Sequence, residues 1–267
     1  VRCGTSRRES RIDRHDPTCH RELPLTRAGR CVLATVFVLA IVSCVRPSID
    51  ADLKRVAGLV AGGDESGAIA AVESIVSEAR SRDGARPAAL ADTLEAVAKV
   101  IEDATTEPAR TQAERLLLQA VSLREQASGP DSLDVARTLS ALSGVYFAAG
   151  RYADAERVER RALATRRNRL GPTNPETLTG MRDLASILLS LGRYRDAAAL
   201  AEESLLATGQ SRADRAESLD VLGEVRRVQN RYADAEAAFR EASSVAEAAP
   251  DADPLLLAAL CNNLAGL

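Results

Sequence analysis

Apolar residues in the second half of the chain recur at steps of three and four positions. In residues 136–148 the apolar set is Ala136, Leu139, Leu142, Val145 and Tyr146. This spacing places the set on one stripe of an α-helix. A second helix is predicted from residue 152, after a glycine at 150 that tolerates the positive φ of a tight turn. Its inner positions are Ala155, Val158, Ala162 and Leu163.

The same helical hairpin recurs along the chain. An Arg-Tyr-X-Asp-Ala sequence occurs at 151–155, 193–197 and 231–235, so its tyrosines are separated by 42 and then 38 residues. In the last turn Asn230 replaces the glycine. One helix pair cannot bury its apolar stripe alone, whereas stacked pairs share a continuous core. The sequence therefore predicts an elongated, all-α solenoid of antiparallel helix pairs.

These units resemble tetratricopeptide repeats, and the 42-residue spacing is similar to that of the kinesin-light-chain type. The resemblance implies a right-handed superhelix. The family places a Leu and a small residue in the first helix, facing an Ala in the second, because a large side chain would separate the helices. The matching sets are Leu142-Ser143 with Ala155, Leu184-Ala185 with Ala197, and Leu222-Gly223 with Ala235. Phe239 fills the aromatic position of the family, where the equivalent residue two units earlier is Glu159.

The repeat pattern divides the chain into three regions. Residues 88–267 form the repeat domain, and residues 47–87 are helical, with a possible degenerate repeat. The last unit is incomplete, because residues 258–265 resemble a first helix with no second helix after it. We expect its Leu260, Leu264 and Leu267 to be partly uncovered. Either the sequence is a fragment of a longer protein, or this helix is an abbreviated cap.

Residues 1–46 have the character of a signal region. Their apolar segment, 31–43, is shorter than the roughly 20 residues that a membrane-spanning helix needs, and it follows Arg27 and Arg30. The sequence Ile41-Val42-Ser43-Cys44 resembles a bacterial lipobox. This resemblance implies cleavage before Cys44, acylation of its sulfur, and anchoring of the exported protein to a membrane of the bacterial cell envelope. The alternative is a short apolar helix with an incidental cysteine.

Composition and charge indicate which residues fill the core and which class of partner the chain does not bind. Aromatic residues make up 3% of the chain, so the core must be filled by Ala, Leu and Val. The net charge is −3, and residues 1–46 contribute +5, which leaves the rest of the chain acidic. An acidic body lacks the basic surface that phosphate binding needs. We therefore expect no nucleic-acid partner.

The repeats lack the residues that most catalytic sites require. Both histidines, His15 and His20, lie before residue 21, so no Ser-His or Cys-His pair can form in the repeats. Cys261 is expected to be a small core residue. The arginine pairs at 160–161 and 166–167, interleaved with glutamates, are interpreted as solvated helix faces with local ion pairs. We predict no enzyme activity, no cofactor and no metal site.

The family resemblance implies a concave groove lined by the first helix of each pair. Such grooves bind extended peptides or partner helices. The candidate groove residues are Arg137, Ser140, Arg182, Ser186, Asp220, Glu224, Arg227 and Asn262. They could equally be ordinary exposed polar positions, and their mixed signs do not select an acidic or a basic ligand.

The predicted function is a non-catalytic protein–protein interaction scaffold, tethered to a membrane, that binds a peptide or a partner protein. One alternative is the recognition arm of a larger, truncated enzyme, such as a CHAT-type protease or a kinase. Another alternative is a structural part of an envelope or secretion assembly.

Overall fold

The computed structural model describes residues 47–102, 106–207, 210–248 and 254–267. Within these ranges the chain is all-helical, with no strand. The helices are α2 (Pro47–Ala61), α3 (Glu65–Asp83), α4 (Pro87–Glu102), α5 (Glu107–Ser128), α6 (Leu133–Ala148), α7 (Tyr152–Leu170), α8 (Pro175–Ser190), α9 (Tyr194–Leu205), α10 (Arg212–Val228), α11 (Tyr232–Glu247) and α12 (Pro254–Ala265). The predicted signal region, with its apolar segment 31–43 and Cys44, lies outside the described residues.

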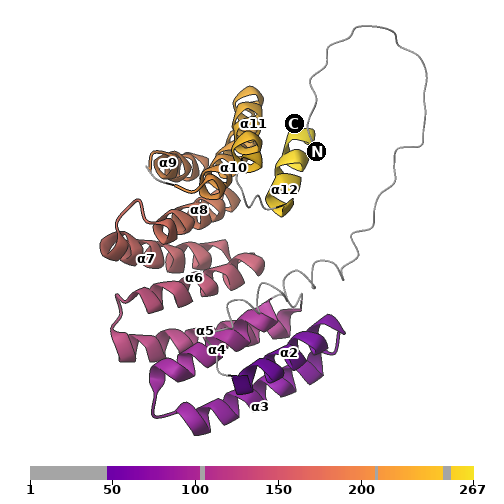
Figure 1. The fold of residues 1–267 in the computed structure, drawn as a ribbon, viewed down its shortest axis with the longest axis vertical. Helices are drawn as coiled ribbons and strands as arrows, with labels where there is room; N and C mark the ends of the chain where they lie inside the picture. The colour runs from indigo at the N-terminus through magenta and orange to yellow at the C-terminus, as the bar shows by residue number, and fades with distance from the viewer. Residues whose placement is uncertain (1–46, 103–105, 208–209, 249–253) are drawn as a thin grey trace, which may run out of the picture.

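Successive helices pack as pairs, and the pairs stack on one another. Helices α4 and α5, α6 and α7, α8 and α9, and α10 and α11 form the pairs, and each second helix also contacts the first helix of the following pair. Figure 1 shows this order running from α2 and α3 at one end of the molecule to α12 at the other. The predicted all-α solenoid is confirmed. No described helix has the length and apolarity needed to span a membrane.

The three predicted hairpin turns have one backbone geometry. Gly150, Gly192 and Asn230 have φ values of 72°, 74° and 60°. In each turn the next residue is an arginine that donates its backbone N–H to a carbonyl of the preceding helix, at 2.9 Å for Arg151 and 2.8 Å for Arg193. The left-handed conformation predicted at Gly150 and Asn230 is confirmed.

The shorter spacing of the last repeat comes from α9. This helix has 12 residues, whereas its equivalent α7 has 19. The segment between α9 and α10 is longer than the one between α7 and α8, but the extra residues make up for only part of the shorter length of α9. The interval between Tyr194 and Tyr232 is therefore 38 residues instead of 42.

The predicted apolar stripes form the core. All five positions of the α6 stripe are at most 4% exposed, and the four inner positions of α7 are at most 5% exposed. The crossing of α6 and α7 is as close as predicted, because Ser143 Oγ donates to the carbonyl of Ala155 at 3.3 Å. At the α10–α11 crossing the Phe239 ring packs against the predicted small residue, because a Cβ built on Gly223 would lie 2.5 Å from Cε1 of Phe239. Ala235, which was predicted to face Gly223, is fully buried in the same cluster as Phe239.

The exposure of α12 corrects two expectations. Leu260 is fully buried, although it was expected to be partly uncovered, because it points into the cluster that contains Phe239. Cys261 is exposed rather than buried, because it is rotated by about 100° from Leu260 around the helix axis, away from the side that packs on the cluster. Leu264 is half-buried and Leu267 is 39% exposed, as expected.

Candidate interaction surface

The first helices α8, α10 and α12 lie side by side and are joined by polar contacts. Arg182 Nη2 on α8 lies 2.8 Å from Glu217 Oε2 and 3.1 Å from Asp214 Oδ1, both on α10. On the other side of α10, Asn263 Nδ2 of α12 donates to Asp220 Oδ1 at 2.9 Å. We call the surface formed by the first helices α4, α6, α8, α10 and α12 the A-helix face.

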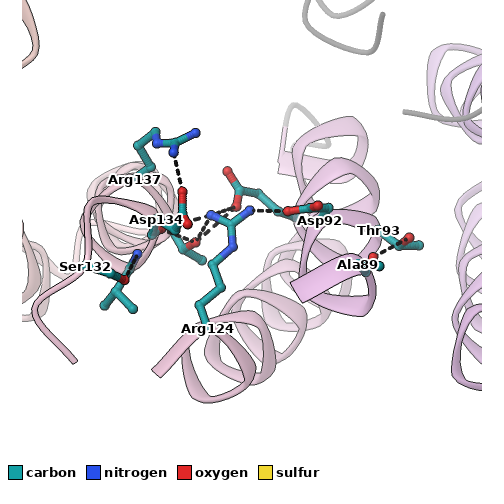
Figure 2. Close-up of polar contacts among 10 residues, drawn as sticks. Ala89, Asp92, Thr93, Arg124, Ser132, Asp134 and Arg137 are labelled. Atoms are coloured by element: carbon teal, nitrogen blue, oxygen red, sulfur yellow. Dashed lines mark hydrogen bonds and ion pairs between the residues drawn. The ribbon is translucent and has the colours of Figure 1, made fainter. Parts of the chain in front are cut away.

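A buried arginine ties α4 to α6 at this face (Figure 2). Arg124 extends from α5, and its guanidinium lies 2.8 Å from both Asp92 Oδ1 and Glu95 Oε2 of α4. It also donates to Thr138 Oγ1 at 2.7 Å and to the carbonyl of Asp134 at 2.9 Å, both on α6. The Arg124 side chain is only 9% exposed. A second-helix arginine therefore bridges two successive first helices.

Arg166 has the equivalent place in the next unit, 42 residues later. Its Nη1 donates to Ser140 Oγ at 2.8 Å and lies 3.3 Å from Glu159 Oε1. Ser140 in turn donates to the same carboxylate oxygen at 3.0 Å. A Cβ on Gly180 of α8 would lie 3.1 Å from Arg166 Nη1, so the absence of a side chain there makes room for the ion pair. Glu159 is completely buried, and its Oε2 accepts no hydrogen bond from the described residues.

The prediction of solvated charges at this position is wrong for Glu159 and Arg166. It holds for Arg160, which makes an exposed i,i+4 pair with Glu156 at 2.8 Å. Two signals in the sequence point to the buried pair. Glu159 stands where the family has a core aromatic, and Arg166 follows Arg124 at the full 42-residue spacing.

An acidic patch lies on α8 and α10. We define it by its five carboxylates and two guanidiniums: Asp183, Asp214, Glu217, Asp220, Glu224, Arg182 and Arg227. Desolvation by the surrounding protein raises the pKa of Asp183, and Glu217 raises it further against the opposing effect of two arginines. Desolvation also raises the pKa of Asp220, as do Glu224 and Glu217, whereas its hydrogen bond from Asn263 lowers it. Because the patch holds five carboxylates and two guanidiniums, acidic groups outnumber basic groups in it.

The predicted groove residues have different surroundings. Four of them, Arg182, Asp220, Glu224 and Arg227, belong to the acidic patch, and Glu224 pairs with Arg227 at 2.7 Å. Arg182 is 7% exposed and is held by its ion pairs.

The other four candidates do not form one cluster. On α6, Arg137 is exposed and pairs with Asp134, while Ser140 belongs to the buried network. Ser186 donates to the carbonyl of Arg182 at 3.1 Å, and Asn262 is exposed on α12. Contact of any candidate with a partner stays a prediction. Asp183, Asp214 and Glu217 complete the patch and were not predicted.

The described residues also limit the chemistry of this surface. Across these ranges, no group of three or more His, Cys, Asp or Glu side chains is arranged to hold a metal ion. Both histidines lie outside the described residues.

Comparison with known proteins identifies the repeats. Residues 110–168 and 177–208 match tetratricopeptide repeat models. The fold is similar to that of kinesin-light-chain-like, nearly identical TPR-like repeats from Podosopora anserina, with a TM-score of 0.60, 15% identity, and coverage of 74% of this chain and 94% of that chain. It is also similar to BtubC (BKLC) from P. vanneervenii, with a TM-score of 0.60, 16% identity, and coverage of 85% and 92%. No curated protein matches the chain. Residues 110–168 and 177–208 thus contain tetratricopeptide repeats, and the fold is similar to that of kinesin-light-chain-like repeat structures.

Proposed function

We propose that this chain is a non-catalytic protein–protein interaction scaffold that binds an extended segment of a partner across its A-helix face. Tetratricopeptide repeats generally mediate protein partner binding and are generally non-catalytic. Solenoids offer extended concave surfaces for such binding. The acidic patch on α8 and α10 is the observation that carries the proposal.

The patch determines the chemistry of the proposed partner. The pKa values of Asp183 and Asp220 are raised, so each carboxylate lacks enough favourable neighbours to offset desolvation and nearby negative charge. A lysine or arginine side chain of a partner would supply that missing charge through charge-assisted hydrogen bonds. Nucleic acid would add negative charge to the same surface. The partner is therefore a protein segment that carries basic residues.

Binding of labelled peptides to the full chain tests this proposal. Two peptides of equal length, one rich in lysine and arginine and one rich in aspartate and glutamate, are compared by fluorescence anisotropy. The expected result is binding of the basic peptide only, with an affinity that falls as salt is raised. Removing two charges from the patch, with Asp183→Asn and Asp220→Asn, should weaken binding about tenfold, which corresponds to ~1.4 kcal/mol.

The matched control removes the same charge from α3. Glu73→Gln and Glu78→Gln change two exposed carboxylates outside the A-helix face and should leave binding unchanged. Preference for the acidic peptide, or equal losses in the two double variants, would contradict the proposed surface.

The proposal also includes a lipid anchor at Cys44. It is supported by the Ile41-Val42-Ser43-Cys44 sequence and the apolar segment 31–43 before it. Acyl chains on this residue would hold the repeats at a membrane of the bacterial cell envelope. Cys44→Ser should move the expressed protein from the detergent phase to the aqueous phase, while Cys31→Ser should not. Unchanged partitioning of Cys44→Ser would reject the anchor and leave the interaction surface untouched.

A further inference from the structure

Glu159 is a buried anion whose hydrogen bonding is incomplete. Its side chain is fully buried, and its Oε1 accepts from Ser140 at 3.0 Å and lies 3.3 Å from Arg166 Nη1. Its Oε2 and the Nε of Arg166 have no hydrogen-bond partner among the described residues. Buried polar groups are normally paired, and a buried ion pair is weak evidence for stability. In the α10–α11 hairpin Phe239 fills the same position, so the fold itself does not require a carboxylate there.

This buried pair lies between the first helices α6 and α8. Helix α8 packs closely on α10 and contacts α6 much less. The pair reaches both sides of this looser junction, because Arg166 donates to Ser140 of α6 and a Cβ on Gly180 of α8 would lie 3.3 Å from Glu159 Oε1. A buried charge is therefore placed at a junction of the A-helix face, the surface proposed to bind the partner.

Asp183 brings a second carboxylate to the same junction. It lies on α8 one turn after Gly180, is exposed, and makes no hydrogen bond or ion pair with the described residues. The surrounding protein still raises its pKa by desolvation, as expected for a group that solvent can reach but that lies in a hollow of the surface. Desolvation also raises the pKa of Glu159, and the negative charge of Asp183 raises it further. The junction thus holds one buried and one accessible carboxylate that repel each other.

We infer that Glu159 is a positioning residue for partner binding: with Asp183 it forms a carboxylate pair that takes up either a proton or a basic side chain of the partner. This coupling rests on the proposed function, because the basic segment supplies the cation. Without a partner, a proton on Glu159 relieves the repulsion between the two carboxylates. A lysine or arginine bound at Asp183 relieves it instead, so the proton leaves Glu159 for the solvent and the carboxylate becomes ionised. Binding and proton release are then linked.

The groups around the pair set the pH at which the proton leaves. Those that act on it are, helix by helix, Ser140 on α6, Arg166 on α7, Arg182 on α8 and Glu217 on α10. The hydroxyl and the two guanidiniums favour ionised carboxylates, whereas Glu217 and desolvation oppose ionisation. Desolvation has the largest effect and raises the pKa of Glu159 to about 7. The competition therefore falls near neutral pH, and a basic segment should bind more tightly as pH rises towards about 7.

The pH dependence of binding by the full chain measures this coupling. Fluorescence anisotropy with the lysine- and arginine-rich peptide is recorded in mild detergent at constant ionic strength, from about pH 5.5 to about pH 8. Binding by the wild type should tighten by up to about tenfold per pH unit, the limit for release of one proton, and become constant above about pH 7. Glu159→Gln has no proton to release, so its affinity should change less with pH and stay near the low-pH affinity of the wild type.

Calorimetry measures the released proton itself, which a purely structural role of Glu159 would not produce. At about pH 6.5 the enthalpy of peptide binding should differ between phosphate and imidazole buffers, because imidazole takes up a released proton with a larger enthalpy change. The difference between the buffers should shrink in Glu159→Gln.

Two further variants separate this coupling from a folding defect. Glu236→Gln removes a half-exposed carboxylate from α11 and should keep the wild-type pH profile. Asp183→Asn should bind more weakly and move the midpoint of the profile to lower pH, because the Glu159 carboxylate then lacks its negative neighbour. If circular dichroism shows Glu159→Gln to be unfolded, this midpoint decides alone, and an unchanged midpoint overturns the coupling.

The outcomes distinguish the coupling from the function on which it rests. The same pH profile in the wild type and in folded Glu159→Gln would overturn the coupling and leave the A-helix face as the binding surface. Failure of the basic peptide to bind at any pH would overturn the proposed function itself.

Discussion

Glu159 and Arg166 form an ion pair inside the solenoid, with Oε1 and Nη1 3.3 Å apart. The pair lies at the position where the α10–α11 hairpin has Phe239. Desolvation raises the pKa of Glu159 from 4.5 to about 7, and the negative charge of Asp183 contributes, against the effects of Ser140 and Arg166. Replacing a core aromatic by a carboxylate therefore makes the packing of α6, α7 and α8 sensitive to pH.

The stability of the protein should decrease as pH rises between about 4.5 and about 7. In this interval the folded state binds the Glu159 proton more tightly than the unfolded chain does, so the free energy of unfolding falls with pH. Above about pH 7 the carboxylate is ionised in both states and this dependence ends. Glu159 contributes at most about 3 kcal/mol to this change in the free energy of unfolding. Urea unfolding at several pH values across the interval, monitored by circular dichroism, measures the change.

Glu159→Gln isolates this contribution. The amide cannot titrate, so the variant should lose the part of the pH slope that Glu159 causes. Glu236→Gln, which removes a half-exposed carboxylate from α11, should retain the wild-type slope. Equal slopes for wild type and Glu159→Gln would show that the buried carboxylate does not titrate in this range.

The repeat and its turns could be predicted from the sequence because their causes are local. The stripe from Ala136 to Tyr146 follows helical periodicity, and Gly150 and Asn230 occupy positions that require positive φ. Neither feature depends on residues far away in the chain. The 42-residue spacing then indicated which helices would stack.

The buried charges and the exposure of Cys261 depended on packing between distant residues. Arg166 was assigned to a solvated face because its neighbours in sequence are charged, but α6 and α8 enclose it. Cys261 was assigned to the core from its residue type, whereas its exposure follows from which neighbour α12 packs against. The acidic patch was missed in part because Arg182 meets Asp214 and Glu217 only after α8 and α10 pack.

Gly223→Ala should destabilise the protein by about 1–3 kcal/mol, since the added Cβ would lie 2.5 Å from the Phe239 ring and force the two helices apart. Gly144→Ala is the matched control, because a Cβ there would meet nothing within 4 Å. That variant should be more stable by roughly 0.5–1 kcal/mol, from helix propensity alone. Thermal and urea unfolding measure both, and equal effects of the two substitutions would contradict the close packing at Gly223.

Arg124→Ala should cost about 2–4 kcal/mol, less than the removal of one member of a fully buried pair, because Asp92 is largely exposed. The loss comes from the contacts of Arg124 with α4 and α6 (Figure 2), whereas the direct hydrogen bond from Thr138 Oγ1 to Glu95 Oε2 at 3.0 Å remains. Arg124→Lys should retain only part of the stability that Arg124→Ala loses, since an ammonium cannot reach all four acceptors at once. Arg157→Ala, at a side chain 69% exposed, should change the free energy of unfolding by no more than about 0.5 kcal/mol. A loss for Arg124→Ala as small as that for Arg157→Ala would mean that the bridge adds no stability.

Ala198→Glu should strengthen the junction between α9 and α11, because it restores an ion pair that the other junctions have. Arg151 pairs with Glu114 of the previous second helix at 2.8 Å, and Arg193 pairs with Glu156 at 2.5 Å. The residue that corresponds to these glutamates for Arg231 is Ala198, and among the described residues Arg231 pairs with Asp234 of its own helix turn. The expected gain is about 0.2–1 kcal/mol in the free energy of unfolding, and it should shrink at high salt.

Two controls test whether the gain comes from this ion pair. Ala199→Glu, one position further on the same helix, should give no gain, and Arg231→Ala should abolish the gain from Ala198→Glu in a double-mutant cycle. A gain that persists without Arg231 would have to come from helix α9 itself and would contradict the proposed ion pair.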